Sequence, residues 1–303
     1  MSYLYFPGCS LKSTGRAYEE SMLAVFKALN VPLPELDDWN CCGATSYMAI
    51  NEMKAFALSA RNFAIAEKTI GNNNGTADMV VPCAACYMGL NKTKLYLNEH
   101  PELKTTIDSA LQEAGLTYEG KVKVRHPLDV LVNDIGLDKI SNTVKKPLKG
   151  MKIASYYGCQ IIRPFAEFDD QHNPQTMDKL MKALGAEVVD WPIKTRCCGG
   201  SLVGTVPEVG LRLSYLLLKE AKKRGADAVV TACPLCQYNL ECNQDRMAKD
   251  FGEKVNVPVA YFTQVMGLAF GLSEKELGIN RLFTPIKYVE KPNAVKGGSH
   301  VAN

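Results

Sequence analysis

The sequence contains no long apolar run, no strong surplus of charge and no recognisable leader segment. No apolar stretch of the 303-residue chain approaches the roughly 20 residues that a membrane-spanning helix needs. The opening segment, MSYLYFPGCSL, lacks a basic region followed by an apolar core, so we expect no signal peptide and a cytoplasmic location. The formal charge is only +3 at pH 7, whereas nucleic-acid-binding proteins usually carry a strong basic surplus. We therefore expect neither a membrane span nor nucleic acid as a partner.

Several motifs of redox and metal proteins are missing as well. There is no Cys-x-x-Cys-x-x-Cys run of the ferredoxin kind and no binding signature for a flavin or a nicotinamide. The usual pair of close Cys-x-x-Cys motifs that holds structural zinc is also missing. In a reducing compartment, cysteines are more often metal ligands or catalytic groups than disulfides. The eleven cysteines of this chain must therefore serve in another arrangement.

What the sequence does contain is a cysteine pattern that occurs twice. Each copy has one single cysteine, one Cys-Cys-Gly and one Cys-x-x-Cys, and together the copies use ten of the eleven cysteines. The first copy consists of Cys9, Cys41, Cys42, Cys83 and Cys86. The second copy consists of Cys159, Cys197, Cys198, Cys233 and Cys236. An ordered repeat of this kind indicates an internal duplication.

The two copies align along most of the chain. Their single cysteines and their Cys-x-x-Cys motifs are each 150 positions apart, whereas their Cys-Cys pairs are 156 apart. The first copy regains these six residues through the loop insert at 71–76. Neighbouring segments repeat too, as in ADMVVPCAAC and ADAVVTACPLC. We therefore expect two domains, at residues 1–149 and at residues 150–303, the second ending in a polar tail.

Short apolar runs alternate with segments of helical periodicity. The expected strands cover 3–6, 79–81, 122–124, 152–157, 188–192, 228–230 and a segment near Val257. The expected helices cover 17–29, 51–70, the stretch from about 86 to 115, 128–135, 176–184 and 207–223, with a linker at 138–150. Residues from about 285 onward form either a frayed tail or an arm that docks a partner.

This order predicts an α/β fold of two pseudo-symmetric, Rossmann-like repeats. Each repeat should hold a mainly parallel sheet flanked by helices. The cysteines follow strands or open helices, so both sets should lie at the carboxyl ends of the strands, where sites gather in such sheets.

Five cysteines in each half favour a polynuclear metal site. Thiolates bind soft metals, and five of them exceed both the four ligands of one zinc ion and the four of a regular cubane. An iron–sulfur site is favoured, while zinc and buried structural thiols stay open as alternatives. Glycine after each Cys-Cys pair permits a positive φ and lets both sulfurs approach one cluster. Cys242 has no counterpart, because Lys92 holds the matching place, and we expect an ordinary packed or free thiol there.

The twin pattern resembles that of the B subunit of methanogen heterodisulfide reductase. The segments YFPGCSLKSTGRAYEESMLAVFKAL and ELDDWNCCGATSYM are similar to that protein nearly residue for residue, and the resemblance covers the whole chain. It implies a noncubane [4Fe-4S] cluster in each half, bound by all five cysteines of that half. One departure is the longer spacing from Cys42 to Cys83, which could move a loop near the first cluster.

The resemblance also implies an oxidoreductase. Its substrate would be the heterodisulfide of coenzyme M and coenzyme B, reduced to two thiols in the last step of methanogenesis. This reduction takes two electrons, so two clusters facing a shared cleft could each bind one substrate sulfur and deliver one electron. Implied partners are the small ferredoxin-like subunit and the flavin subunit of an electron-bifurcating complex, supplied by a hydrogenase or a formate dehydrogenase.

Both halves of that substrate carry anionic groups, which cations near the cysteines could bind. The candidates are Lys12, Arg16, Arg163 and Arg196, and each could instead be a solvated surface cation. His126 follows a strand and could approach the first cluster, although a core histidine bonded to backbone is the stronger interpretation.

Three other functions stay open. A thiol of Cys83 or Cys233 could attack a disulfide as in thioredoxin-like enzymes, but three cysteines in each half would then have no role. Modules with this motif in succinate, glycolate and lactate-oxidising systems suggest electron transfer or quinone contact instead. The metals could also only hold a non-catalytic assembly subunit together.

Overall fold

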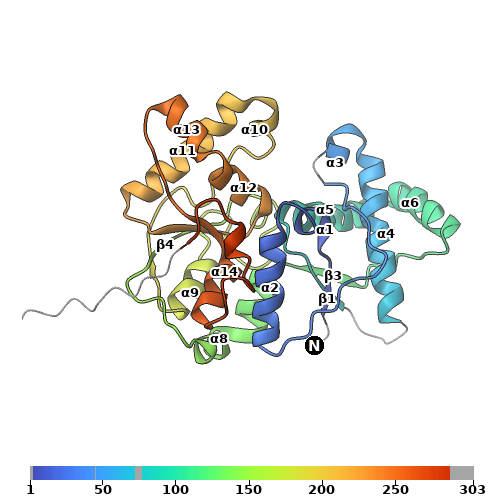
Figure 1. Cartoon of the computed structure of the whole chain (residues 1–303). Helices are drawn as coiled ribbons and strands as arrows, with labels where there is room; N and C mark the ends of the chain where they lie inside the picture. Colours follow the sequence, from blue (N-terminus) through green and yellow to red (C-terminus); the bar gives the residue numbers. More distant parts are fainter. Residues whose placement is uncertain (1–2, 45, 72–76, 287–303) are drawn as a thin grey trace, which may run out of the picture.

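The computed structural model describes residues 3–44, 46–71 and 77–286, which form two lobes with one parallel sheet each (Figure 1). The first sheet holds β1 (Tyr3–Tyr5), β2 (Ala77–Val80) and β3 (Val122–Arg125), in that order. The second holds β4 (Lys152–Tyr156), β5 (Glu187–Val188), β6 (Ala228–Thr231) and β7 (Val259–Tyr261), in the order β5-β4-β6-β7. All paired strands are parallel, which confirms the predicted α/β fold of two repeats.

The two sheets differ at one edge. β1, β2 and β3 match β4, β6 and β7 in order and direction. β5 extends the second sheet beyond β4, whereas the first half makes an isolated parallel bridge at the same edge, between Tyr5 and Glu35. Pro34 precedes this bridge, and proline cannot donate a ladder hydrogen bond. Most strand residues are buried, because helices cover the sheets.

Helices connect the strands in both halves. In the first half they are α1 (Gly8–Leu11), α2 (Arg16–Ala28), α3 (Ser46–Ile50), α4 (Glu52–Ile70), α5 (Ala84–Glu99), α6 (Pro101–Glu113), α7 (Pro127–Asp129) and α8 (Leu137–Thr143). In the second half they are α9 (Thr176–Ala183), α10 (Leu202–Thr205), α11 (Pro207–Lys223), α12 (Pro234–Cys242), α13 (Gln244–Phe251) and α14 (Phe262–Ala269). Asn51 caps α4, accepting a hydrogen bond from the Lys54 amide at 3.0 Å.

Several local predictions differ from the structure. The strand expected at 188–192 is wrong over most of its length, because β5 covers only Glu187–Val188. The linker expected at 138–150 is wrong over its first part, because α8 continues to Thr143 and buries Ile140. The segment Val130–Gly136 forms a π-helix rather than a regular α-helix. The short helices α3 and α10 were not predicted, since a helix of one turn carries too little periodicity to be read from sequence. The polar tail beyond residue 286 and most of the insert at 71–76 lie outside the described residues.

Helices of one half pack against helices of the other half across their boundary. α2 of the first half packs along α14 of the second half at the centre of the molecule (Figure 1). The hydroxyls of Ser21 and Thr263 share a buried hydrogen bond of 2.6 Å at this contact. In the reciprocal contact, α9 of the second half packs against α7 and α8 of the first half. The first long helix of each half is thus covered by the last helices of the other.

Two pairs of stacked rings also connect the two halves. Tyr18 of α2 lies parallel to Tyr261 of β7, with ring centroids 4.5 Å apart. Phe168 of the second half lies parallel to His126, which follows β3, at 6.1 Å. Tyr18 and Phe168 are 150 positions apart, so the two stacks are related by the duplication. Aromatic pairs contribute through both their area and their geometry, and here a buried pair and one with the half-buried Phe168 join one half to the other.

The strands of each sheet come from one side of residue 150, whereas the helix packing crosses it. The division into 1–149 and 150–303 therefore describes the repeat, and its place as a domain boundary stays a prediction. Within the part of the chain that the structure describes, no helix has the length and apolar character that crossing a membrane requires.

Shared packing predicts that both halves unfold together. Phe262 is fully buried on α14 and meets the Tyr18 ring edge-on at 5.9 Å. Phe262→Ala should lower the free energy of unfolding by about 3–5 kcal/mol, because it removes a core ring at the contact between the halves. Denaturant unfolding followed by circular dichroism should still show one transition. Leu216→Ala, at a half-exposed position, serves as the control and should change little. A variant that melts in two separate steps would contradict the shared core.

Candidate metal centres

The strand and helix ends bring each cysteine set together. In the first half, Cys9 lies in α1 directly after β1, and Cys83 occupies the position before α5, whose first turn contains Cys86. Cys41 and Cys42 lie in the loop before α3. All five therefore reach the carboxyl edge of the first sheet, as the order of strands and helices predicts.

The sulfurs of the first set form a continuous chain of contacts. Cys42 Sγ lies 3.0 Å from Cys86 Sγ, which is far longer than a disulfide bond, and all the cysteines are free thiols. Hydrogen bonds from Cys42 and Cys9 hold the pKa of Cys41 far below that of an ordinary thiol. A hydrogen bond from Cys86 likewise lowers the pKa of Cys83 to about 7. The five sulfurs follow one another in the order Cys9, Cys41, Cys42, Cys86 and Cys83.

The second set repeats this chain. Cys198 Sγ lies 3.4 Å from Cys236 Sγ. Hydrogen bonds from Cys159 and Cys198 lower the pKa of Cys197, and the nearby Arg163 guanidinium adds to the shift. Cys233 precedes α12 as Cys83 precedes α5, and it is hydrogen-bonded to Cys236. The duplication therefore preserves the arrangement of the sulfurs as well as their order in sequence.

Glycine after each Cys-Cys pair allows the pair to reach its partner helix. Gly43 has a φ of +74° and Gly199 a φ of +99°, both in the left-handed region that favours glycine. A Cβ on Gly43 would lie 2.9 Å from the Ala55 backbone in α4, and one on Gly199 would lie 2.9 Å from the Gly210 backbone in α11. The predicted positive φ is confirmed, and both conformation and space exclude a side chain at these positions. That the turns bring both sulfurs to one cluster stays a prediction.

A serine from the same helix fixes each pair. Ser59 of α4 donates a hydrogen bond to the carbonyl of Cys42 at 2.7 Å, and Ser214 of α11 donates one to the carbonyl of Cys198 at 2.7 Å. Both serines are fully buried. Their spacing from the Cys-Cys pairs is similar, but hydroxyls in the middle of a helix gave no sequence signal for this role.

The cysteine sets fit a cluster of several irons. Each set offers five thiol sulfurs, the donor type that holds iron–sulfur clusters. Gly8 and Gly158 both have a positive φ, and a Cβ there would lie 2.9 Å from Cys86 Sγ or 3.2 Å from Cys236 Sγ, so the backbone forms a close cradle around the sulfurs. Within the described residues, no three ligand side chains are grouped as they would be around one metal ion.

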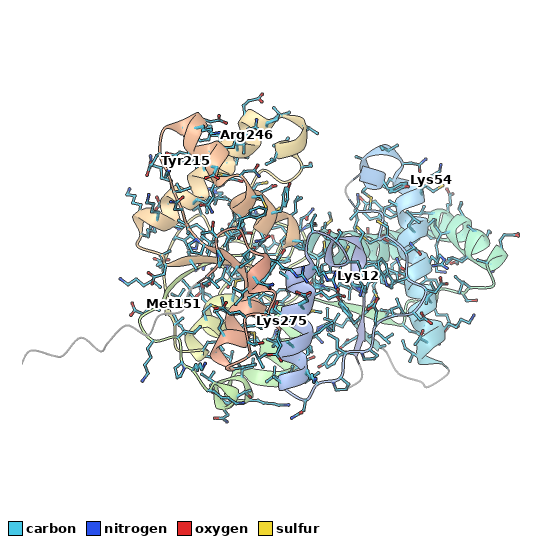
Figure 2. All side chains as sticks on the ribbon, in the orientation of Figure 1. Lys12, Lys54, Met151, Tyr215, Arg246 and Lys275 are labelled. Atoms are coloured by element: carbon cyan, nitrogen blue, oxygen red, sulfur yellow. The ribbon has the colours of Figure 1, made fainter. Side chains whose placement is uncertain are left out.

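Lys12 supports the first set through ion pairs. Its Nζ lies 2.6 Å from Glu19 in α2 and 2.7 Å from Glu35, and Figure 2 labels it near the junction of the lobes. Tyr5 in β1 also donates to Glu19, at 3.0 Å. Lys12 therefore ties the loop that follows Cys9 to the next helix and to the edge of the sheet.

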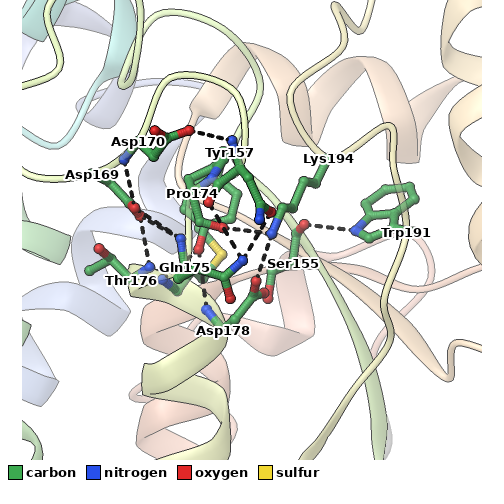
Figure 3. Close-up of polar contacts among 12 residues, drawn as sticks. Ser155, Tyr157, Asp169, Asp170, Pro174, Gln175, Thr176, Asp178, Trp191 and Lys194 are labelled. Carbon is green, nitrogen blue, oxygen red and sulfur yellow. Dashed lines mark hydrogen bonds and ion pairs between the residues drawn. The ribbon is translucent and has the colours of Figure 1, made fainter.

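Lys194 does the same for the second set (Figure 3). Its Nζ lies 2.9 Å from Asp178 in α9 and donates to the carbonyl of Pro174 at 2.6 Å. Its own carbonyl accepts a hydrogen bond from the Tyr157 amide at 2.9 Å. Because Lys194, Asp178 and their partners are buried, this network fixes the segments on either side of Cys159 and Cys197.

The two sets approach each other where the halves meet. A Cβ on Gly15, in the loop after α1, would lie 3.2 Å from Pro234 in the second Cys-x-x-Cys. His126 Nε2 lies 3.2 Å from the carbonyl of Pro82 and also bonds the backbone of Ala232, the residues just before Cys83 and Cys233. Burial lowers the pKa of His126 to about 4. The expected core histidine is therefore confirmed, and it bridges both Cys-x-x-Cys loops.

Tyr18 is a residue that gave no functional signal in the sequence. It is fully buried, and within the described residues its hydroxyl has no hydrogen-bond partner. Burial raises the pKa of Tyr18, and the nearby sulfurs of Cys233 and Cys83 raise it further. An unpartnered hydroxyl close to both sets is what a donor to a cluster or a substrate sulfur would require.

The predicted substrate cations fall into two groups. Lys12 and Arg16 line a cavity of about 750 Å³ between the loop after α1 and α12, together with Tyr238, Cys242 and other residues. Both are ion-paired, Arg16 with Glu20 at 3.3 Å. Cys242 is a half-buried free thiol, as expected.

Arg163 and Arg196 lie outside that cavity lining, near Cys197. Arg163 donates to the carbonyl of Thr195 at 2.5 Å. Arg196 is exposed, and its backbone carbonyl accepts a hydrogen bond from Tyr156 at 2.6 Å. The structure thus divides the four cations between two places, and their role in binding a substrate stays a prediction.

Comparison with known proteins gives several relatives of nearly equal length. The chain is 32% identical to the 8-methylmenaquinol:fumarate reductase membrane anchor subunit of Wolinella succinogenes, covering 92% of this chain and 95% of that protein. It is 30% identical to the B subunit of the ferredoxin/F420H2-dependent CoB-CoM heterodisulfide reductase of Methanosarcina acetivorans, covering 91% of each. It is 31% identical to an Archaeoglobus profundus protein described as like the B subunit of heterodisulfide reductase, covering 92% and 94%.

A solved structure shares the fold. A crystal structure of a hypothetical protein from Helicobacter pylori superposes on this chain with a TM-score of 0.75 at 15% identity. The superposition covers 95% of this chain but only 53% of that protein. The family described as Cysteine-rich domain matches residues 3–91 and again residues 153–241. The two matched segments are the two cysteine repeats, so the chain belongs to the cysteine-rich CCG-domain family, in the group that includes the B subunit of heterodisulfide reductase.

Proposed function

We propose that this chain is the catalytic subunit that reduces the coenzyme M–coenzyme B heterodisulfide to two thiols. The observation that carries the proposal is the approach of two equivalent five-cysteine sets at one junction, with Gly15 against Pro234 and His126 bonded beside both Cys-x-x-Cys loops. Two such centres close together could each deliver one of the two electrons that the reduction of a disulfide takes. Relatives that are named as the B subunit of heterodisulfide reductase support the choice of substrate.

In this proposal each half holds one noncubane [4Fe-4S] cluster through its five cysteines. When bound, the clusters supply electrons and Lewis-acidic iron to the substrate sulfurs. The chain's own residues keep the thiolates together, through Ser59 and Ser214 and through the tight turns at Gly43 and Gly199. The buried rings of Tyr18 and Tyr261 exclude water from the region between the sets.

The cavity lined by Lys12 and Arg16 is the proposed entry for the substrate. It opens next to the loop after Cys9 and next to α12, which begins just after Cys233. Lys12 already pairs with two carboxylates, Glu19 and Glu35, so of the two cations Arg16, which is largely exposed, is better placed to attract an anionic group. Electrons would come from partner proteins, namely the proposed ferredoxin-like and flavin subunits of a cytoplasmic complex.

A second candidate function is electron exchange with a quinol-linked system. It is favoured by the 32% identity to a subunit of 8-methylmenaquinol:fumarate reductase, which is comparable to the identity with the heterodisulfide reductase subunits. The same cysteine sets would then relay electrons without binding a disulfide. Response to the heterodisulfide separates the two candidates.

The first prediction of the proposed function concerns metal content. Anaerobically purified protein should contain about eight iron and about eight acid-labile sulfide per chain, with negligible zinc. Cys42→Ala should lose about half of the iron, because it removes a buried ligand of one set only. Cys242→Ala is the matched control and should keep all of it. About four iron plus about one zinc in the parent would mean that only one half holds a cluster.

The second prediction concerns the substrate. Adding the heterodisulfide to the loaded protein should change its electron paramagnetic resonance spectrum, whereas a menaquinol analogue should not. Cys41→Ala and Cys197→Ala should each abolish this response and lower the rate of thiol formation by more than about 100-fold, since loss of a ligand exceeds the usual effect of outer-shell changes. A fully active Cys41→Ala variant would count against ligation by five cysteines. A response to the quinol analogue alone would favour the second candidate.

A further inference from the structure

The two cysteine sets differ at one buried position that faces a sulfur. Asn239 of α12 donates its side-chain amide to Cys198 Sγ at 3.6 Å and to the carbonyl of Gly200 at 2.8 Å. It is only 1% exposed, so both amide hydrogens are used inside the protein. The matching residue of the first half, 150 positions earlier, is Gly89, which has no side chain to donate.

Packing explains why the first half cannot hold an amide there. A Cβ on Gly89 would lie 3.0 Å from the Cβ of Ala44. The residue that matches Ala44, two positions after the Cys-Cys pair, is Gly200, whose carbonyl accepts the hydrogen bond from the Asn239 side chain. A Cβ on Gly200 would meet no atom within 4 Å, so the tight contact at Ala44 belongs to the first half alone. The pair Ala44 and Gly89 is therefore replaced by the pair Gly200 and Asn239.

Other hydrogen bonds to the two buried sulfurs are equivalent. The amide of Gly200 lies 3.4 Å from Cys198 Sγ, and the amide of Ala44 makes the corresponding bond to Cys42. The amides of Gly43 and Gly199 lie 3.5 Å and 3.3 Å from the first sulfur of each pair. The side-chain amide of Asn239 is therefore an additional donor that the second set has and the first lacks.

A hydrogen bond to a ligand sulfur changes the reduction potential of an iron–sulfur cluster. Reduction adds negative charge that spreads onto the sulfurs, and an N–H dipole pointing at a sulfur stabilises that charge. The effect is strong where water is excluded, as at the buried Cys198. Arg163, near Cys197, adds positive charge on the same side, whereas Ser13 holds its place in the first half.

We propose that Asn239 makes the second cluster the easier of the two to reduce. The inference rests on the proposed iron–sulfur sites. Asn239 acts through Cys198 and touches no reacting atom, so it is a positioning residue. The second site would accept the first electron, and the first site would be the stronger reductant once both are reduced.

Asn239 and Arg163 favour the second site. The hydrogen bond from Ser10 to Cys83, at a place where the second half has Gln160, favours the first. The buried amide of Asn239 outweighs that bond and sets the order of reduction.

The test is a redox titration followed by electron paramagnetic resonance on the loaded full-length protein. Cys42→Ala and Cys198→Ala variants, each lacking one cluster, identify which signal belongs to which site. In the parent protein, the signal of the second site should appear first. Asn239→Leu, which keeps the volume but removes both donors, should shift the electron distribution toward the first site by about tenfold, or about 59 mV for a one-electron couple.

The reciprocal variant moves the donor to the first half. Ala44→Gly combined with Gly89→Asn reproduces the second site around Cys42, and it should raise the potential of the first cluster by a similar amount. Asn239→Gln, which keeps an amide with a longer stem, should recover part of the parent's difference. This pair of experiments stays informative if Asn239→Leu fails to fold.

The outcomes separate this inference from the proposed function. Protein that contains no iron would overturn the proposed function and the inference with it. Two iron–sulfur signals with equal potentials, or potentials that neither Asn239→Leu nor the transplanted pair changes, would overturn the inference alone. Loss of iron from Asn239→Leu with an unchanged potential in the transplanted variant would also overturn it, because Asn239 would then only hold the loop.

Discussion

The structure depends on holding five thiol sulfurs together that are distant in sequence and chemically alike. Neighbouring side chains such as Cys41 and Cys42 normally point apart, and their approach requires the left-handed turn at Gly43 and contact with the α4 backbone. Ser59 then fixes the Cys42 carbonyl. The five thiols of a set are crowded, and crowding disfavours both dense packing and the protonation of every sulfur. A metal that replaced the protons would therefore stabilise the fold of each set. The parallel sheets serve this constraint, since only the carboxyl ends of parallel strands return the segments to one edge.

The second organising feature is that the sets meet at a buried junction. His126, Tyr18 and Tyr261 lie where the halves meet: Tyr18 stacks on Tyr261 of the other half, and His126 is bonded to the backbone just before both Cys-x-x-Cys motifs. The low pKa of His126 keeps it neutral there, because burial outweighs its two backbone hydrogen bonds. Aromatic rings thus line the junction, and among the described residues the Tyr18 hydroxyl lies there without a partner. Surroundings of this kind suit chemistry on sulfur better than they suit conventional acid–base catalysis.

Much of this was predictable because the duplication acts as an internal alignment. Strand positions, the cysteine sets and the glycine turns follow from spacing and periodicity, and the order of strands settles which ends meet. The packing of helices across the boundary between the halves was not predictable, since it depends on long-range contact of α2 with α14 rather than on a local pattern. The role of Lys12 was hidden for a similar reason: a lysine near a cysteine suggests an anion site, and only the structure reveals Glu19 and Glu35 beside it. The difference between Gly89 and Asn239 was visible in the aligned repeats, but its meaning required the position of the Cys198 sulfur.

The packing of helices between the two halves has a consequence for how such a chain can change over evolutionary time. A single repeat on its own would expose the apolar face of its first long helix, so it could be stable only as a symmetric pair of identical copies. In such a pair, every substitution near one set of sulfurs would occur in both. Joining the repeats in one polypeptide keeps the shared core and releases that requirement. One half can then carry Gly200 and Asn239 while the other carries Ala44 and Gly89, so that two equivalent sets of sulfurs on one scaffold acquire different surroundings.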